Sequence, residues 1–167
     1  MASNNRIDIQ PDNSDWPPKF IICVGTIVLK ESKVLFIRLA KGESLEGQWS
    51  IPWGFVNNDE TPEEAAIRET IEESGIKTDV DGLLGIQDLS KSGWLGIIFL
   101  SHHIEGEPNA DGKETDMAAY LSLDDLINMD EPIEPWCKWL AIRVLEGNYS
   151  LIHAEQESPY RPRLGFF

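Results

Sequence analysis

Residues 53–76 concentrate carboxylates on a segment that is expected to be helical. Glu69, Glu72 and Glu73 stand at positions i, i+3 and i+4. Because an α-helix advances about 100° per residue, these three side chains share one face within an arc of about 100°. Like charges at this spacing repel one another, whereas Mg²⁺ or Mn²⁺ is bound by such a cluster of hard oxygen ligands. The spacing raises the hypothesis of a metal site, against the simpler alternative of a solvated acidic face.

The neighbours of these glutamates are also expected to make contacts. Arg68 can offset part of the repulsion by forming an ion pair. Ala65 and Ala66 are small, so we expect them to leave room for a ligand to approach the carboxylates, while Ile67 and Ile71 project from the opposite side of the helix. A simple amphipathic helix would bury only the isoleucines and hydrate the glutamates.

The spacing of the whole segment resembles the signature of the Nudix hydrolases, the Nudix box, which the sequence matches from Gly54 to Ile76. Thr70, where an aliphatic residue is usual, is the one soft departure. Matching so many fixed positions makes this a specific motif. The matched residues are Gly54, Glu60, Arg68, Glu69, Glu72, Glu73, Gly75 and Ile76.

This resemblance implies a fold, a reaction and a cofactor. The fold would be the Nudix fold, an α/β (α+β) arrangement in which a mixed β-sheet is sandwiched between α-helices. The reaction would be the hydrolysis of the pyrophosphate of a nucleoside diphosphate linked to another moiety, with Mg²⁺ or Mn²⁺ bound by the glutamates. Some Nudix domains instead bind nucleotides as sensors without turnover, but they usually have an eroded box, so the intact box favours an enzyme.

The resemblance also assigns roles to residues of the box. Glu72 and Glu73 are the first choices for metal ligands, and Glu69 is the third and a candidate for orienting or deprotonating the water. Which glutamate acts as the base is left open. Arg68 is expected to hold a glutamate in place through a charge-assisted hydrogen bond, with Glu60 in a supporting role. The two glycines of the box, Gly54 and Gly75, would serve backbone geometry.

Two further site residues are candidates by the same resemblance. Trp53 stands where the family usually has glycine or alanine, and its backbone carbonyl is a candidate metal ligand, while its indole either shapes the pocket entrance or packs in the core. A further acid often comes from a loop after the box. Glu114 is our choice for this acid, and Asp111 and Asp116 compete with it. The tandem His102 and His103 are interpreted as structural or substrate-edge residues.

The substrate is indicated only weakly by the sequence. The "GFV" that follows Trp53 is similar to a variant found in Nudix enzymes acting on ADP-ribose or NADH, although the zinc-ribbon cysteines of NADH pyrophosphatases are not evident. ADP-ribose-like or dinucleotide substrates are therefore favoured, with modified nucleoside triphosphates second. Four aromatic residues could stack on a base or pack in the core: Trp49, Trp53, Phe55 and Trp94.

Composition excludes several other classes of function. The 167 residues carry a formal net charge of −15, which argues against nonspecific binding to nucleic acids or anionic membranes. The chain has two cysteines, too few and too far apart for a disulfide framework or a zinc site, and a cytoplasmic protein with free thiols is expected. The N-terminal "MASNNRIDIQ" is polar and has no apolar core, so no signal peptide is expected, and no apolar run is long enough to span a bilayer.

The remaining elements must position these residues. Pro62 and Thr61, with Glu64 completing a capping box, predict a helix over 62–74 that ends at Gly75. Trp136 and Trp139 belong to one apolar face of a helix predicted within 132–147. A shorter helix is predicted to begin at 124. Runs rich in apolar residues predict strands at 19–29, 34–40, 49–52, 81–90, 93–106 and 117–123.

The pattern predicts one catalytic domain with an extension at each end. Residues 1–18 are expected to form a loose arm, 19–148 the domain and 149–167 a C-terminal tail. The apolar "RLGFF" of this tail could cover the domain or swap onto a partner in a homodimer.

Overall fold

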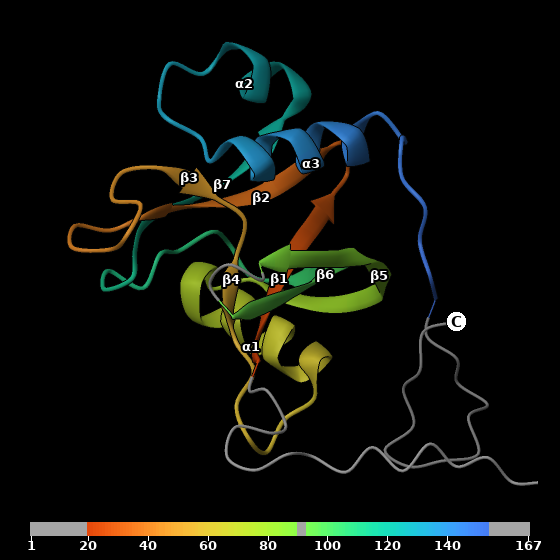
Figure 1. Cartoon of the computed structure of the whole chain (residues 1–167). Coiled ribbons are helices and arrows are strands. Elements are labelled where there is room, and N and C mark those ends of the chain that lie inside the picture. The colour runs from red at the N-terminus through yellow and green to blue at the C-terminus, as the bar shows by residue number, and fades with distance from the viewer. Residues whose placement is uncertain (1–19, 90–92, 154–167) are drawn as a thin grey trace, which may run out of the picture.

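The computed structural model describes residues 20–89 and 93–153. A mixed β-sheet has α1 on one face and α2 and α3 on the other (Figure 1), which confirms the predicted fold class. The strands are β1 (Ile21–Lys30), β2 (Lys33–Leu39), β3 (Trp49–Ser50), β4 (Trp53–Phe55), β5 (Lys77–Leu89), β6 (Trp94–Glu105) and β7 (Thr115–Ser122). The helices are α1 (Pro62–Ser74), α2 (Leu123–Asn128) and α3 (Pro135–Leu145).

Strand β1 forks the sheet. One of its edges pairs in parallel with β6 over nearly its whole length. Its other edge pairs with β4 at Cys23–Gly25 and with β2 only at its far end, where Leu29 and Lys30 meet β2. The strands β2 and β4 therefore diverge from a common edge, and both line the cavity described below.

Alternate residues of β1 enter two hydrophobic layers, as the two-residue period of a strand requires. Val24 packs in a cluster with the alanines of α1, whereas Ile27 packs in a cluster with Ala141 and Val144 of α3. Burying both faces of the sheet holds β1 at the centre of the molecule.

Helix α1 has the predicted bounds because its caps are local. The Thr61 side chain accepts a hydrogen bond from the Glu64 N–H, and the Glu64 carboxylate accepts one from the Thr61 N–H. Gly75 ends the helix in the left-handed conformation, with φ of 71°. Few residues other than glycine adopt this conformation without strain.

The orientation of α1 differs from the expectation for its alanines. Ala65 and Ala66 are fully buried against the sheet and do not line the cavity that contains the carboxylates, while Ile71 is 43% exposed. The reason is that small side chains let the helix axis lie close to the sheet. This close approach draws Glu73 into the interior of the protein.

Two strand predictions have wrong bounds. The strand expected at 49–52 is broken, since β3 pairs with β2 and β4 pairs with β1. Pro52 lies at the break and has no N–H for a continuous ladder. Strand β5 begins at Lys77, soon after α1, and not at residue 81.

The predicted apolar face of α3 is wrong in one residue, because Trp139 is not on the buried face and is 53% exposed.

The predicted arm at 1–18 lies outside the described residues, and so does the predicted tail beyond residue 153. Before that point, the N–H and C=O of Ile152 both bond to Leu83 of β5, at 3.0 and 2.8 Å.

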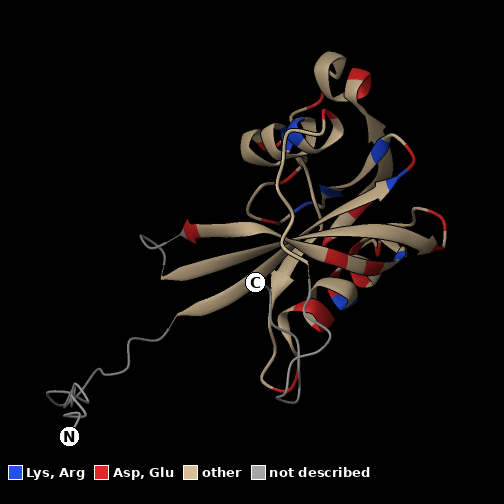
Figure 2. Cartoon of the chain, turned by 90° about the vertical axis from the view of Figure 1, so that its right-hand side faces the viewer, with Lys and Arg blue, Asp and Glu red and all other residues tan. Residues whose placement is uncertain are grey.

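None of the described helices has the length and apolar character needed to cross a membrane. Acidic residues occur along α1 and in several loops, and basic residues are fewer (Figure 2).

Candidate active site

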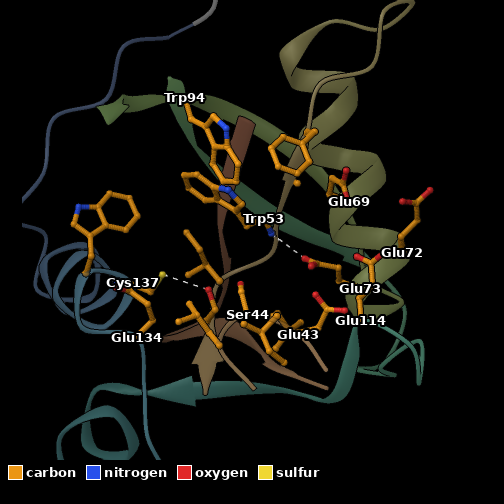
Figure 3. Close-up of a pocket in the computed structure, with 18 of the residues that line it drawn as sticks. Glu43, Ser44, Trp53, Glu69, Glu72, Glu73, Trp94, Glu114, Glu134 and Cys137 are labelled. Carbon is orange, nitrogen blue, oxygen red and sulfur yellow. Dashed lines mark hydrogen bonds between the residues drawn. The ribbon is translucent and has the colours of Figure 1, made fainter. Parts of the chain in front are cut away.

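A cavity of about 670 Å³ lies between the two forked strands, α1 and α3. Its two ends differ in chemistry (Figure 3). The indoles of Trp53 and Trp94 lie at one end. Four carboxylates gather at the other end, from Glu69, Glu72, Glu73 and Glu114.

Glu73 is the most deeply buried of these carboxylates, with 4% of its surface exposed. It accepts a hydrogen bond of 2.8 Å from the backbone N–H of Trp53, which ties α1 to β4. Burial raises the pKa of Glu73 well above its usual value, and the negative charges of Glu69 and Glu114 raise it further. The ionised form of Glu73 therefore needs a positive charge, and among the described residues no lysine or arginine is paired with it.

Glu69 lies directly against the backbone of β4. A Cβ atom added to Gly54 would overlap the Glu69 carboxyl group, so only glycine allows this contact. Burial raises the pKa of Glu69, while the Arg68 guanidinium at 2.7 Å lowers it. The structure thus gives the glycine of the motif a steric role, since its φ is not positive.

Arg68 connects the members of the motif. Its guanidinium donates to Glu69 at 2.7 Å, to Glu72 at 2.9 Å, to both oxygens of Glu60 and to the Phe55 carbonyl. These bonds lower the pKa of Glu60 to about 2. All five N–H groups of Arg68 are engaged in this way, so its charge is spent on positioning glutamates. Glu72 stays 56% exposed at the rim.

The backbone of Trp53 faces the acidic end. Trp53 of β4 lies opposite Gly25 of β1. In the next pair along this ladder the Thr26 N–H donates to the Pro52 carbonyl, and hydrogen-bonded and non-hydrogen-bonded pairs alternate in antiparallel strands. In this register Trp53 belongs to a non-hydrogen-bonded pair, whose N–H and C=O point away from the partner strand. Its carbonyl therefore points to the same side as the N–H that bonds to Glu73.

The three acids predicted downstream of the motif lie in different places. Glu114 lines the cavity. Asp111 instead accepts hydrogen bonds from three successive backbone N–H groups, those of residues 113–115, and from the Thr115 hydroxyl, and so holds its own loop. Asp116 forms an ion pair of 2.8 Å with Arg38. Of the three, only Glu114 lines the cavity together with the glutamates of α1.

The tandem histidines lie away from this cavity. His102 is exposed and contacts Asp81 at 2.7 Å, while His103 contacts the hydroxyl of Tyr120 at 2.8 Å. Trp49 is also elsewhere: it is 2% exposed in the core, and its indole N–H donates to Glu131.

The indole end of the cavity joins remote parts of the chain. Trp53 and Trp136 meet edge to face, with ring centroids 6.2 Å apart, and so do Phe55 and Trp94 at 5.1 Å. Gln87 of β5 also lines this cavity. The sequence did not identify Trp136 or Gln87 as site residues, because the sheet brings them in from α3 and β5 and neither belongs to a motif.

Two more acids of the lining, Glu43 and Glu134, were also missed. Glu43 belongs to the loop between β2 and β3, and Glu134 caps α3 by accepting from the Cys137 N–H at 2.7 Å. A cap of this kind is a signal that the sequence offers. Cys137 itself contacts the Ser50 hydroxyl, and burial raises the pKa of its thiol to about 12, so it is no nucleophile at neutral pH.

The charges around this cavity are unbalanced. Among the described residues that line it, Arg68 is the only lysine or arginine, and its donors are already used. Six glutamates line the same cavity: Glu43, Glu69, Glu72, Glu73, Glu114 and Glu134. An anionic ligand could enter the acidic end only together with cations.

The acidic end offers oxygen donors of the kind found in divalent metal sites, but the described residues do not bring three or more carboxylate, imidazole or thiol side chains together in a ready-made metal-binding group. Its donors are hard oxygen atoms, which Mg²⁺ and Mn²⁺ prefer. The buried carboxylate of Glu73 accepts a single protein hydrogen bond of 2.8 Å and has unused acceptor capacity. Of the metal ligands predicted from the sequence, Glu69, Glu72 and Glu73 line this end of the cavity, and the Trp53 carbonyl points toward it.

The chain is similar in sequence to a family of known proteins. The family model described as "NUDIX domain" matches residues 19–140. A MutT-like protein of Streptomyces ambofaciens is 30% identical over 139 residues, covering 83% of each chain. An ADP-ribose pyrophosphatase of Methanocaldococcus jannaschii is 32% identical over 126 residues, covering 71% of this chain and 73% of the relative.

Solved structures share the fold at lower identity. A NUDIX hydrolase from Nitrosomonas europaea superimposes with a TM-score of 0.67 at 24% identity, covering 75% of this chain and 70% of the other. An ADP-ribose pyrophosphatase from Streptococcus suis gives a TM-score of 0.64 at 22% identity, covering 79% and 94%.

Proposed function

Because the chain belongs to the Nudix family of hydrolases, which act on phosphoanhydride bonds, we propose that it cleaves the pyrophosphate of a nucleoside diphosphate linked to another moiety, with Mg²⁺ or Mn²⁺. ADP-ribose represents the favoured class of substrate. The relative from Methanocaldococcus jannaschii, whose name states this activity, supports the choice.

The observation that carries the metal dependence is the buried, uncompensated charge of the acidic end. Glu73 is almost fully buried, and the one arginine of the cavity lining already neutralises other glutamates. A diphosphate would add two or more negative charges to this end. Divalent cations between the two sets of oxygens would remove the repulsion.

Each residue of the acidic end has a role in this proposal. Glu69, Glu72, Glu73 and the Trp53 carbonyl would hold the ions. When bound, such ions neutralise the diphosphate, polarise its P–O bonds and lower the pKa of a bound water. Arg68 fixes the carboxylates in position and Glu60 orients Arg68.

Proton transfer from the water falls to a carboxylate of the same end. Glu69 and Glu114 are the two candidates, since both line the cavity and neither is held by a backbone N–H as Glu73 is.

The rest of the lining suits a sugar better than another phosphate. Glu43, Glu134, Ser44 and Ser50 offer oxygen acceptors and hydroxyl groups, which pair with sugar hydroxyls. A further phosphate in the same place would face carboxylates without a free cation. This balance favours ADP-ribose over nucleoside triphosphates.

The test is a substrate panel with Mg²⁺ and with Mn²⁺. ADP-ribose, NADH, diadenosine polyphosphates, 8-oxo-dGTP and the dNTPs would be offered to the wild type and to Glu73→Gln. Glu105→Gln, at an exposed position of β6 outside the cavity, is the matched control. We expect selective turnover of ADP-ribose that EDTA and Glu73→Gln abolish and that Glu105→Gln leaves intact.

Two outcomes would overturn parts of this proposal. Faster turnover of 8-oxo-dGTP than of ADP-ribose would replace the substrate class. Metal-dependent binding of nucleotides without turnover of any compound would make the protein a sensor.

A further inference from the structure

Trp53 occupies a prepared place in the sheet. Gly25 of β1 and Gly96 of β6 lie beneath its indole: a Cβ at Gly25 would overlap the ring, and one at Gly96 would lie 2.8 Å from its Cη2 atom. Neither glycine has a positive φ, so their backbone conformations do not require glycine. Glycine inside a strand weakens the strand, and here it provides space for a flat aromatic ring.

The indole of Trp53 is thus held from one side and partly exposed on the other. Glycine backbone covers one region of the ring, and the edge-to-face contact with Trp136 fixes its tilt at 84°. The remaining surface lines the cavity, next to the indole of Trp94 (Figure 3). A rigid aromatic surface of this kind loses little entropy when a ligand stacks on it.

The chemistry of this end differs from that of the carboxylates. It presents indole and phenyl rings with one amide, Gln87, and no described lysine or arginine. A planar heteroaromatic ring can stack on such surfaces, and an amide can pair with the donors and acceptors on its edge. A phosphate would find no positive partner here.

We propose that the indole end is a nucleobase site and that Trp53, seated on Gly25 and Gly96, determines its specificity. This rests on the proposed function, because the base would belong to the nucleotide whose diphosphate lies at the acidic end. The two ends share one cavity, whose volume of about 670 Å³ is in the range of sites for small ligands.

The experiment measures binding without turnover. Titration calorimetry with Mg²⁺ would compare AMP with ribose 5-phosphate, which share a sugar and a phosphate and differ by the base. We expect the wild type to bind AMP roughly tenfold or more tightly than ribose 5-phosphate, as stacking on one aromatic residue provides. Trp53→Ala should abolish this preference, which is measured as the ratio of the AMP and ribose 5-phosphate affinities in the same variant.

Two further variants separate the site from stability. Gly96→Ala keeps every aromatic residue but displaces the indole, so the preference for AMP should also fall. Trp139→Ala removes an exposed tryptophan of α3 that does not line this cavity and should keep the preference. Circular dichroism of each variant reports whether it is folded.

The proposal is overturned if wild type binds both probes equally, or if folded Trp53→Ala or Gly96→Ala retains the preference. It is also overturned if both affinities fall together, since that marks a structural role alone. The calorimetric experiment measures binding of AMP and ribose 5-phosphate and does not depend on hydrolysis. Failure of the substrate panel would therefore leave the base site testable, and a missing preference in an active hydrolase would remove only the base site.

Discussion

At the scale of single residues, the site depends on contacts that allow no extra atom. The carboxyl group of Glu69 occupies the volume that a side chain at Gly54 would need, while its other side is held by Arg68. The glycine and arginine therefore set the position of one carboxylate from two directions. A shift of about 1 Å at such a site can cost about a hundredfold in rate.

Gly54→Ala tests this constraint. The methyl group should displace the Glu69 carboxylate and lower kcat/KM for the best substrate about a hundredfold. Gly85→Ala is the matched control, because Gly85 also lies in a strand, has no positive φ and has no atom within 4 Å of an added Cβ. Steady-state kinetics with a thermal melt of each variant provide the measurement, and equal activity of the two variants would contradict the steric role.

At the scale of elements, the sequence predicted α1 far better than its surroundings. The capping box and Gly75 act within a few residues, so both ends of the helix could be predicted. The buried face could not, because whether Ala65 or Ile71 packs inside depends on how closely the sheet approaches. The same limit explains why 49–52 was predicted as one strand, although β3 and β4 pair with different partners.

The candidate site likewise has one part that could be predicted from the sequence and one part that could not. Its acidic end lies mainly on one continuous segment, 53–76, and so could be predicted from spacing. The indole end combines β4, β5, β6 and α3, and Trp136 and Gln87 have no local pattern that marks them. Only the three-dimensional pairing of strands brings them together.

Thr61→Ala tests the N-terminal cap of α1 as an element separate from the site. Loss of the capping bond should lower the free energy of unfolding by about 1 kcal/mol in urea titrations. Because Glu69, Glu72 and Glu73 lie two or more turns further on, kcat/KM should change less than about threefold. Ser122→Ala removes the equivalent cap of α2 and is the control. A loss of activity as large as that of Gly54→Ala would show that the first turn of α1 belongs to the site.

At the scale of the whole molecule, the acidic character has a consequence for stability. A net charge of −15 favours solubility but makes the compact state repel itself. The acidic end is the most extreme case, because there the charges are buried as well as crowded. The features that would bind metal ions are therefore expected to destabilise the metal-free protein.

The pKa of Glu73 determines whether this contribution to stability rises or falls with pH. Its pKa is raised in the folded state above the usual 4.5, chiefly by burial. The folded protein therefore holds this proton more tightly than the unfolded chain. The resulting stabilisation is complete below about pH 4.5 and is lost as pH rises through the folded pKa.

Melts of metal-free wild type and Glu73→Gln between pH 4 and 8 should reveal this loss. Glutamine can still accept the Trp53 N–H but cannot ionise, so the variant should be more stable than wild type at pH 8 and nearly equal at pH 4. Mg²⁺ at about 100 times its Kd should then stabilise the wild type by about 2.7 kcal/mol and the variant much less. Glu105→Gln controls for the loss of any one negative charge, and added NaCl controls for the general repulsion between negative charges. Equal Mg²⁺ stabilisation of both proteins would place the metal ion away from Glu73, and a Glu73→Gln melt that follows the wild type at every pH would show that this carboxylate is not destabilised by burial.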